Sequence, residues 1–146
     1  MAVTVSDGTE LDHDDIRHLV VDAGLPLDGL FAQEPTEVLV ARDEDTIVGA
    51  AALEHYGGDG LLRSVVVRPG YRRGGVGSAL TAAAIHKARA SSLARVYLLT
   101  DAAERFFAGH GFSVIGRADA PPAVAASVEW AEACSDTAVP MVKPLA

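Results

Sequence analysis

The sequence lacks several features that would place it in a special class of protein. Its 146 residues include a single cysteine, Cys134, so no disulfide can form within the chain, and we expect a reducing, cytoplasmic environment. No apolar run approaches the ~18 residues of a membrane-spanning helix. Residues 1–7 also lack the basic and apolar parts of a secretory signal. We therefore predict a cytoplasmic protein that does not insert into a membrane.

Positive charge is also scarce. The chain has 12 Lys and Arg against 20 Asp and Glu, which gives a net charge of −8. An acidic chain repels the phosphates of nucleic acid and of anionic lipid, so we exclude both as partners. The histidines are not spaced as metal ligands usually are, so we predict no metal site.

The positive charge that is present is concentrated in one segment. Residues Gly60–Thr100 contain no acidic residue at all. The basic residues of this segment are Arg63, Arg68, Arg72, Arg73, Lys87, Arg89 and Arg95. A basic segment in an acidic protein favours an anionic ligand. A chance run within a strand–helix part of the core is the alternative.

Length and hydrophobic pattern predict one mixed α/β domain that covers residues 1–146. The expected helices are Leu11–Ala23, Val76–Leu93, Ala102–Gly109 and Pro121–Cys134. The expected strands are Val3–Ser6, Glu37–Arg42, Thr46–Tyr56, Leu61–Val67, Arg95–Thr100, Phe112–Gly116 and Ala138–Leu145. The last of these contains two prolines, which favour an edge or terminal position.

A buried strand followed by a turn rich in glycine and arginine is the main functional signal. The strand Leu61–Val67 leads into the turn Pro69–Gly77, and a helix begins at Val76. The glycines let the backbone approach a ligand closely, and the first N–H groups of the helix have no partner within it. With Arg72 and Arg73 alongside, this arrangement predicts a phosphate site.

Two common phosphate-binding patterns do not fit this turn. Gly70 and Gly75 have the spacing of an NTP-binding loop, but Val76 replaces its lysine. Gly75 and Gly77 begin the dinucleotide pattern, but Leu80 stands where its third glycine belongs. The pattern that is present is Arg-x-x-Gly-x-Gly, at residues 72–77.

This pattern, together with Val67-Arg68-Pro69 before it, resembles the pyrophosphate-binding motif of the GNAT superfamily of CoA-dependent N-acyltransferases. A second motif of that family is a strand, then a short helix that ends in an aromatic residue and Gly-Phe. Val96–Thr100 and Phe107–Phe112 resemble it, and the resemblance covers about residues 36–116. It implies a single mixed, mostly antiparallel sheet of about six or seven strands with helices on both faces.

A narrower resemblance concerns the acetyltransferases encoded beside arsenic-resistance operons. Leu61–Ser64, Tyr97–Thr100 and the tail from Arg117 to Lys143 resemble that subfamily. Related members acetylate the amino group of a small arsenic-containing amino acid. The tail departs from the pattern because Pro140 occupies the place of a second cysteine, which thiol-based metalloid binding would need.

The resemblance implies acetyl-CoA as cosubstrate and the amine of a small molecule as acceptor. In that fold the strand Arg63–Val67 diverges from Arg95–Thr100, and the pantetheine arm pairs with the backbone of Val65 and Val67. The expected coenzyme-binding residues are Val65, Val66, Val67, Arg72, Arg73, Gly74, Gly75, Val76, Gly77, Ser78, Thr100 and Phe107.

The catalytic groups are less sharply predicted. Glu54 is the first candidate for the general base, with a solvated strand-end acid as the alternative. Arg63 is a candidate for binding a substrate carboxylate, with a structural ion pair as the alternative. Many family members have a tyrosine at the place of Phe107 as the proton donor. Without it, Tyr97 or water protonates the thiolate, or the thiolate leaves unassisted.

Phe107 also keeps a second class of function open. A module that binds CoA without catalysis, and acts as a sensor or interaction partner, would need no proton donor at this place. Acetylation of a basic protein segment is a third possibility for an acidic protein. The resemblance further implies a homodimer formed through C-terminal strands. A catalytic role for Cys134 is not expected, because an unpaired cysteine is usually a small core residue.

Overall fold

The computed structural model describes residues 3–133 and 137–145, so the prediction for Cys134 lies outside the described residues. One seven-stranded sheet has the order β1-β2-β3-β4-β5-β7-β6. Its strands are β1 (Val3–Asp7), β2 (Thr36–Asp43), β3 (Thr46–Tyr56), β4 (Asp59–Val67), β5 (Arg95–Thr100), β6 (Ser113–Val114) and β7 (Val139–Pro144). Neighbouring strands are antiparallel except β4 and β5. The predicted mixed, mostly antiparallel sheet is therefore confirmed.

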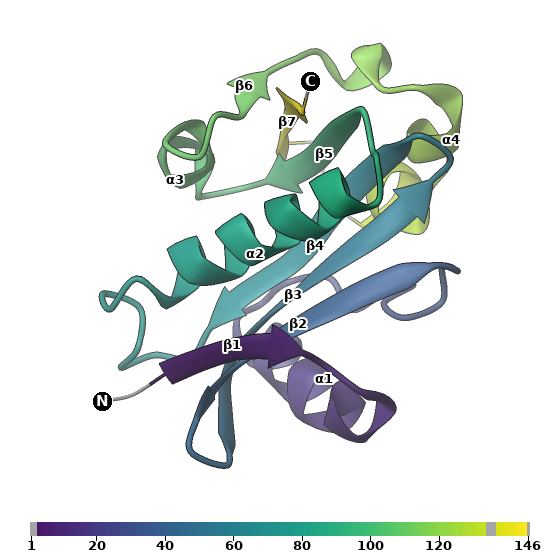
Figure 1. Cartoon of the computed structure of the whole chain (residues 1–146). Coiled ribbons are helices and arrows are strands. Elements are labelled where there is room, and N and C mark those ends of the chain that lie inside the picture. Colours follow the sequence, from purple (N-terminus) through teal and green to yellow (C-terminus); the bar gives the residue numbers. More distant parts are fainter. Residues whose placement is uncertain (1–2, 134–136, 146) are drawn as a thin grey trace.

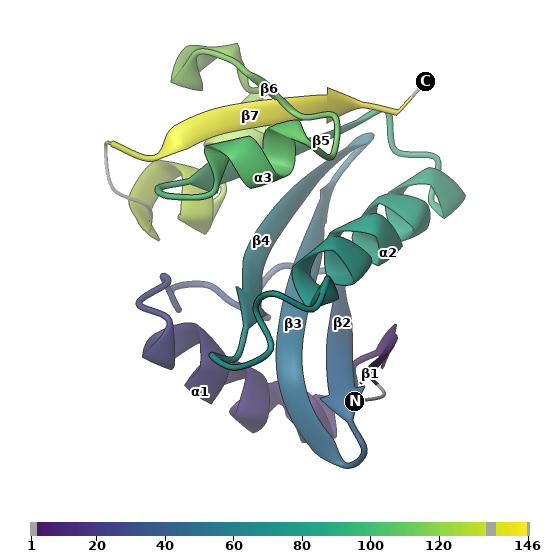
Figure 2. The same ribbon diagram turned by 90° about the vertical axis from the view of Figure 1, so that its left-hand side faces the viewer.

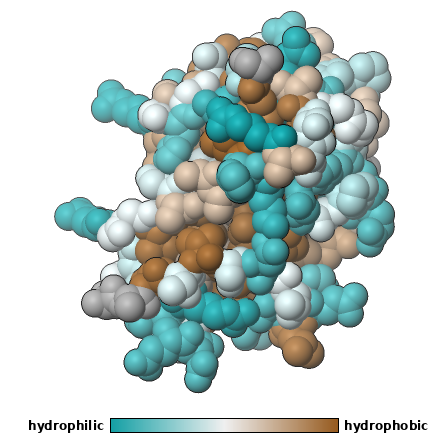
Figure 3. Space-filling model, viewed as in Figure 1, coloured by the Kyte–Doolittle hydropathy of each residue, from teal (hydrophilic) through white to brown (hydrophobic). Residues whose placement is uncertain are grey.

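Helices cover both faces of this sheet (Figure 1). On one face, α1 (His13–Asp22) follows a 3-10 turn, η1 (Glu10–Asp12), and buries Ile16, Leu19 and Val20. On the other, α2 (Val76–Ala90) packs Leu80 and its small alanines into the larger core. The short side chains let α2 lie close to the strands. The surface over α2 and β1 mixes polar side chains with smaller hydrophobic patches (Figure 3).

The parallel strands β4 and β5 pair only at their beginnings. Asp59, Gly60 and Leu61 pair with Arg95, Val96 and Tyr97, and no pairing follows. Figure 2 shows the two strands diverging toward their C-terminal ends. An irregularity in the β3–β4 ladder lies just where they part, and Ser64 there has a positive φ of 56°. A bulge bends its strand, so β4 turns away from β5 as the resemblance implied.

The predicted helix Pro121–Cys134 is broken in the structure. A single turn, α4 (Pro122–Ala125), is followed by a π-helix, η3 (Glu129–Ala133). The Ser127 hydroxyl donates to the Val124 carbonyl at 2.6 Å and accepts from the Trp130 N–H at 3.2 Å. Serine side chains compete in this way with helical hydrogen bonds. The continuous helix was thus a wrong prediction.

The other differences concern the ends of elements. α2 ends at Ala90, short of the predicted Leu93, and Ser92 beyond it has a φ of 59°. α3 (Glu104–Ala108) is shorter than predicted and is followed, after β6, by η2 (Arg117–Asp119). β7 lies between β5 and β6 instead of at an edge. Its prolines are tolerated because β6 pairs only with Met141 and Val142.

Within residues 3–133 and 137–145, no helix combines the length and the apolar character needed to cross a bilayer. The same residues contain no group of three or more His, Cys, Asp or Glu side chains placed to hold a metal ion.

Candidate active site

The divergence of β4 and β5 leaves a cavity of about 710 Å³ between them. It begins at the first turn of α2, follows the C-terminal halves of the two strands, and reaches Glu129 in η3. Leu98, Leu99 and Thr100 line its β5 side. The cavity therefore joins the predicted phosphate site to a group of buried charges at its other end.

The phosphate end is formed by the turn before α2. Gly75 caps this helix with a left-handed φ of 79°, and no atom lies within 4 Å of where its Cβ would be. The first helical hydrogen bond runs from the Ala79 N–H to the Gly75 carbonyl at 3.0 Å, so the earlier N–H groups fall outside the helical pattern. Arg72 donates from Nε to the Val67 carbonyl at 2.9 Å, which fixes its stem beside the turn.

Most predicted coenzyme-binding residues line this cavity. They are Val65, Val67, Arg72, Arg73, Gly75, Gly77, Ser78, Thr100 and Phe107. Three others do not line it: Gly74 is exposed, and Val66 and Val76 are buried in the cores. Strand alternation turns Val66 toward the α1 side, and Val76 points into the core beneath α2.

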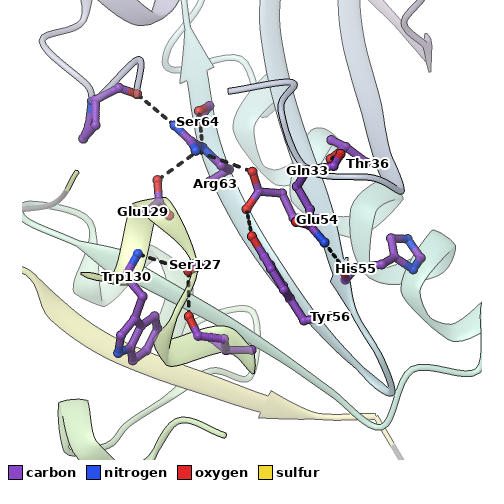
Figure 4. Close-up of polar contacts among 12 residues, drawn as sticks. Gln33, Thr36, Glu54, His55, Tyr56, Arg63, Ser64, Ser127, Glu129 and Trp130 are labelled. Atoms are coloured by element: carbon purple, nitrogen blue, oxygen red, sulfur yellow. Dashed lines mark hydrogen bonds and ion pairs between the residues drawn. The ribbon is translucent and has the colours of Figure 1, made fainter. Parts of the chain in front are cut away.

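Arg63 lines the other end of the cavity, and its guanidinium lies within the wall, because the side chain is completely buried. Figure 4 shows acidic and hydroxyl side chains arranged around it. Nη1 lies 3.5 Å from Glu54 Oε2, and Nε lies 3.4 Å from Glu129 Oε1 and 3.3 Å from the Ser64 hydroxyl. Nη2 donates to the Pro26 carbonyl at 3.2 Å. With two carboxylates already beside it, Arg63 matches the ion-pair alternative and not the expected bidentate site for a substrate carboxylate.

Glu54 is buried and not a solvated strand-end acid. It is 2% exposed, and its Oε1 accepts from the Tyr56 hydroxyl at 2.7 Å. It lines a second, smaller cavity of about 290 Å³, together with Gln33, Tyr56 and Ser127. Burial and the hydrogen bond to Glu54 raise the pKa of Tyr56 well above its usual range. Glu54 does not line the large cavity, but it contacts Arg63, which does.

Sequence reasoning missed Glu129. It is 4% exposed and lines the large cavity from η3. Burial raises its pKa to about 8, while the charge of Arg63 opposes this shift and that of Glu54 adds to it. The sequence gives little signal for this position. Alanines stand at three of its helical neighbour positions, 125, 126 and 133, but the fourth is a second acid, Glu132, so the apolar face that would predict burial is interrupted.

Comparison with protein families decides the class. Residues 34–114 match the model of the acetyltransferase (GNAT) domain. The chain belongs to the GNAT acetyltransferase family. This match confirms the predicted enzyme class, an acetyl-CoA-dependent N-acetyltransferase. It does not single out the arsenic-resistance subfamily.

Solved structures share the GNAT fold along the whole chain. An acetyltransferase of the GNAT family from Staphylococcus aureus Mu50 has a TM-score of 0.83 and 17% identity, over 99% of this chain and 100% of that chain. N-acetylglutamate synthase from Neisseria gonorrhoeae, complexed with coenzyme A and N-acetyl-glutamate, has a TM-score of 0.83 and 21% identity. All of this chain is covered, against 36% of the synthase.

A third structure, Rv2747 from Mycobacterium tuberculosis in complex with CoA and NLQ, has a TM-score of 0.81 and 25% identity. The alignment covers 98% of this chain and 99% of that one. A comparison with curated proteins found no match.

The two aromatic residues considered for proton donation in this GNAT protein lie in different places. Phe107 lines the cavity, but it carries no hydroxyl and packs edge-on against Phe106 and Phe112. Tyr97 is not among the residues that line the cavity. It lies in the paired part of β5, and its ring packs edge-on against Trp130, with centroids 6.2 Å apart. Burial raises the pKa of Tyr97.

Proposed function

We propose that this protein transfers the acetyl group of acetyl-CoA to the amine of a small molecule, and that residues 1–146 act as one domain. The proposal rests on one observation, the difference in charge between the two ends of the large cavity. Arginines and helix N–H groups lie at one end, and a buried carboxylate–guanidinium cluster lies at the other. Coenzyme phosphates favour the first end, and a cationic amine favours the second.

In this proposal the pyrophosphate binds at Arg72, Arg73, Gly75, Gly77 and Ser78, and the backbone at Gly75 is open to a ligand. The pantetheine arm follows β4 along Val65 and Val67, whose main-chain groups no longer pair with β5. One of these N–H groups then donates to the thioester carbonyl as negative charge develops on its oxygen. Thr100 and Phe107 form the opposite wall.

Two of the three solved structures described above contain coenzyme A, and one of these also contains N-acetyl-glutamate. They support an amino acid, or an analogue of one, as the acceptor. The arsenic-containing amino acid implied by the narrower resemblance belongs to the same chemical class. Its test is therefore part of the same substrate panel.

Release of free thiol from acetyl-CoA tests the proposal directly. The panel contains amino acids, amino-acid amides, diamines and an arsenic-containing amino acid, and mass spectrometry identifies any N-acetyl product. Product formation with at least one amine is expected. Micromolar binding of CoA with no product from any amine would contradict the proposal.

That contrary result would favour a module that binds CoA without turning it over. The observation behind this second candidate is Phe107, which places a ring without a proton donor on the cavity wall.

A homodimer stays a prediction, which light scattering after size-exclusion chromatography tests.

A further inference from the structure

One buried oxygen of Glu129 has no satisfying contact. Oε1 lies 3.4 Å from Nε of Arg63, whereas Oε2 has no hydrogen-bond partner among residues 3–133 and 137–145. The side chain is only 5% exposed, so bulk water does little to replace a partner. A buried carboxylate oxygen without a donor is unfavourable. Oε2 is itself buried, but Glu129 lines the large cavity, so a rotation of its side chain brings Oε2 to a bound molecule that supplies the donor.

The charges around this oxygen show which kind of donor fits. Arg63 faces two carboxylates, those of Glu54 and Glu129, and all three side chains are almost fully buried. When both acids are ionised, the cluster carries one more negative than positive charge, and without a ligand a proton on Glu129 removes that excess. Burying an uncompensated charge is costly. An ammonium group adds one positive charge and also donates hydrogen bonds. It therefore supplies both the missing charge of the cluster and the missing donor for Oε2.

The two acids differ in how many of their carboxyl oxygens already have a hydrogen-bond partner. Both oxygens of Glu54 have partners, the Tyr56 hydroxyl at 2.7 Å and Arg63 at 3.5 Å. Among the described residues, Glu129 has a contact at Oε1 alone. Glu54 lines the smaller cavity, and Glu129 lines the large one beside Ser64 and Val65 of β4. Glu129 therefore belongs to the wall of the cavity that we assign to the coenzyme, at the end away from the phosphates.

We infer that Oε2 of Glu129 binds the ammonium group of the acceptor and takes a proton from it before acetyl transfer, with Arg63 and Glu54 as positioning residues. This inference rests on the proposed function. Burial of Glu129 supports it, because a carboxyl pKa of about 8 is close to that of an α-amino group, ~8. A proton then passes between them at little cost. Arg63 on β4 and Glu54 on β3 are the charges that shift this pKa.

The reaction balances with this assignment. Oε2 takes one proton from R–NH3⁺, which frees the nitrogen lone pair. The nitrogen forms a bond to the thioester carbonyl carbon, and the carbon–sulfur bond breaks as the thiolate leaves with its electron pair. The nitrogen loses a second proton, which neutralises the thiolate through water. Glu129 then gives up its proton to solvent as the next ammonium group binds.

The test compares wild type with Glu129→Gln, Glu129→Asp and Glu54→Gln, using acetyl-CoA and an amine found active in the panel. Glu37→Gln is the matched control, because Glu37 also forms an ion pair, with His55 at 2.8 Å, but lines neither cavity. The readouts are kcat/KM from pH 6 to pH 10, the calorimetric Kd for CoA and the thermal midpoint.

We expect Glu129→Gln to lower kcat/KM by about 100-fold or more at pH 7. The loss should shrink above the pKa of the amine, where free base needs no deprotonation. Glu129→Asp should recover part of the rate, and the Kd for CoA should stay within about 2-fold of wild type. Glu37→Gln should behave as wild type.

The outcomes separate the inference from the proposed function. An active wild type with a Glu129→Gln variant of equal rate and pH profile overturns the inference alone. If Glu54→Gln lowers kcat/KM, with recovery at high pH, and Glu129→Gln does not, Glu54 has the role of the base. This result also overturns the inference. A wild type that binds CoA but acetylates no amine overturns the proposed function and the inference with it.

Discussion

Arg63 Nε and Glu129 Oε1 lie 3.4 Å apart and join the central strand β4 to the π-helix near the C-terminal end of the chain. The arginine side chain is completely buried, and the glutamate side chain is 5% exposed. Removing one partner of such a buried pair leaves an uncompensated charge, which typically costs far more than the pair contributes.

We therefore predict that Arg63→Met lowers the free energy of unfolding by about 3–5 kcal/mol, because the buried acidic side chains of Glu54 and Glu129 lose the guanidinium that both contact. Urea denaturation at pH 7 measures this. Arg17→Met is the control, since Arg17 pairs with Asp14 on the surface at 3.0 Å, with side chains 44% and 89% exposed. Its expected effect is under ~1 kcal/mol. Equal effects of the two substitutions would contradict the prediction.

Glu129 should make the stability of the ligand-free protein depend on pH. Burial raises its pKa from 4.5 to about 8, so the folded state holds a proton that the unfolded state has released. Between these two values, its contribution to the free energy of unfolding falls as pH rises, by up to ~1.4 kcal/mol for each pH unit.

Glu129→Gln removes that titration. The stability of the variant relative to wild type should therefore increase from pH 5 to pH 8, as measured by urea denaturation at each pH. A difference that stays constant over this range would show that the Glu129 pKa is not raised.

Phe107→Tyr tests how the thiolate gains its proton. Phe107 lines the cavity where a tyrosine hydroxyl would be available for donation. Because we propose protonation through water, the variant should have the rate and pH profile of wild type, measured by thiol release. A rise of ~100-fold would instead show that a side-chain acid was the missing component.

Local sequence predicted the phosphate end of the site well. The alternating and continuous apolar runs gave the bounds of β3 and β5 as observed, and glycines with arginines marked the turn before α2. These are local signals: strand periodicity, a positive φ at Gly75 and free helix N–H groups all depend on neighbouring residues. The divergence of β4 and β5 came instead from the family resemblance.

The buried charges at the other end of the site depend on contacts between distant segments, such as the one between Arg63 and Glu129. Glu129 gains its position because the Ser127 hydroxyl interrupts the predicted helix and redirects the chain onto Arg63. Propensity favoured a continuous helix there, and the side-chain hydrogen bonds of Ser127 interrupt it. In the same way, Arg63 became an ion-pair partner once two acids were packed beside it, which its own sequence neighbours do not indicate.

The central claim is that main-chain N–H groups at the first turn of α2 bind the pyrophosphate of coenzyme A. Its most direct test is the calorimetric Kd for CoA of wild type and of Gly75→Val/Gly77→Val. Gly57→Val is the control, because Gly57 has a similar φ of 67° and open space around it but does not line the cavity. We predict that wild type binds CoA, that the double variant loses at least ~10-fold in affinity, and that the control does not. No binding by wild type, or unchanged binding by the double variant, would contradict the claim.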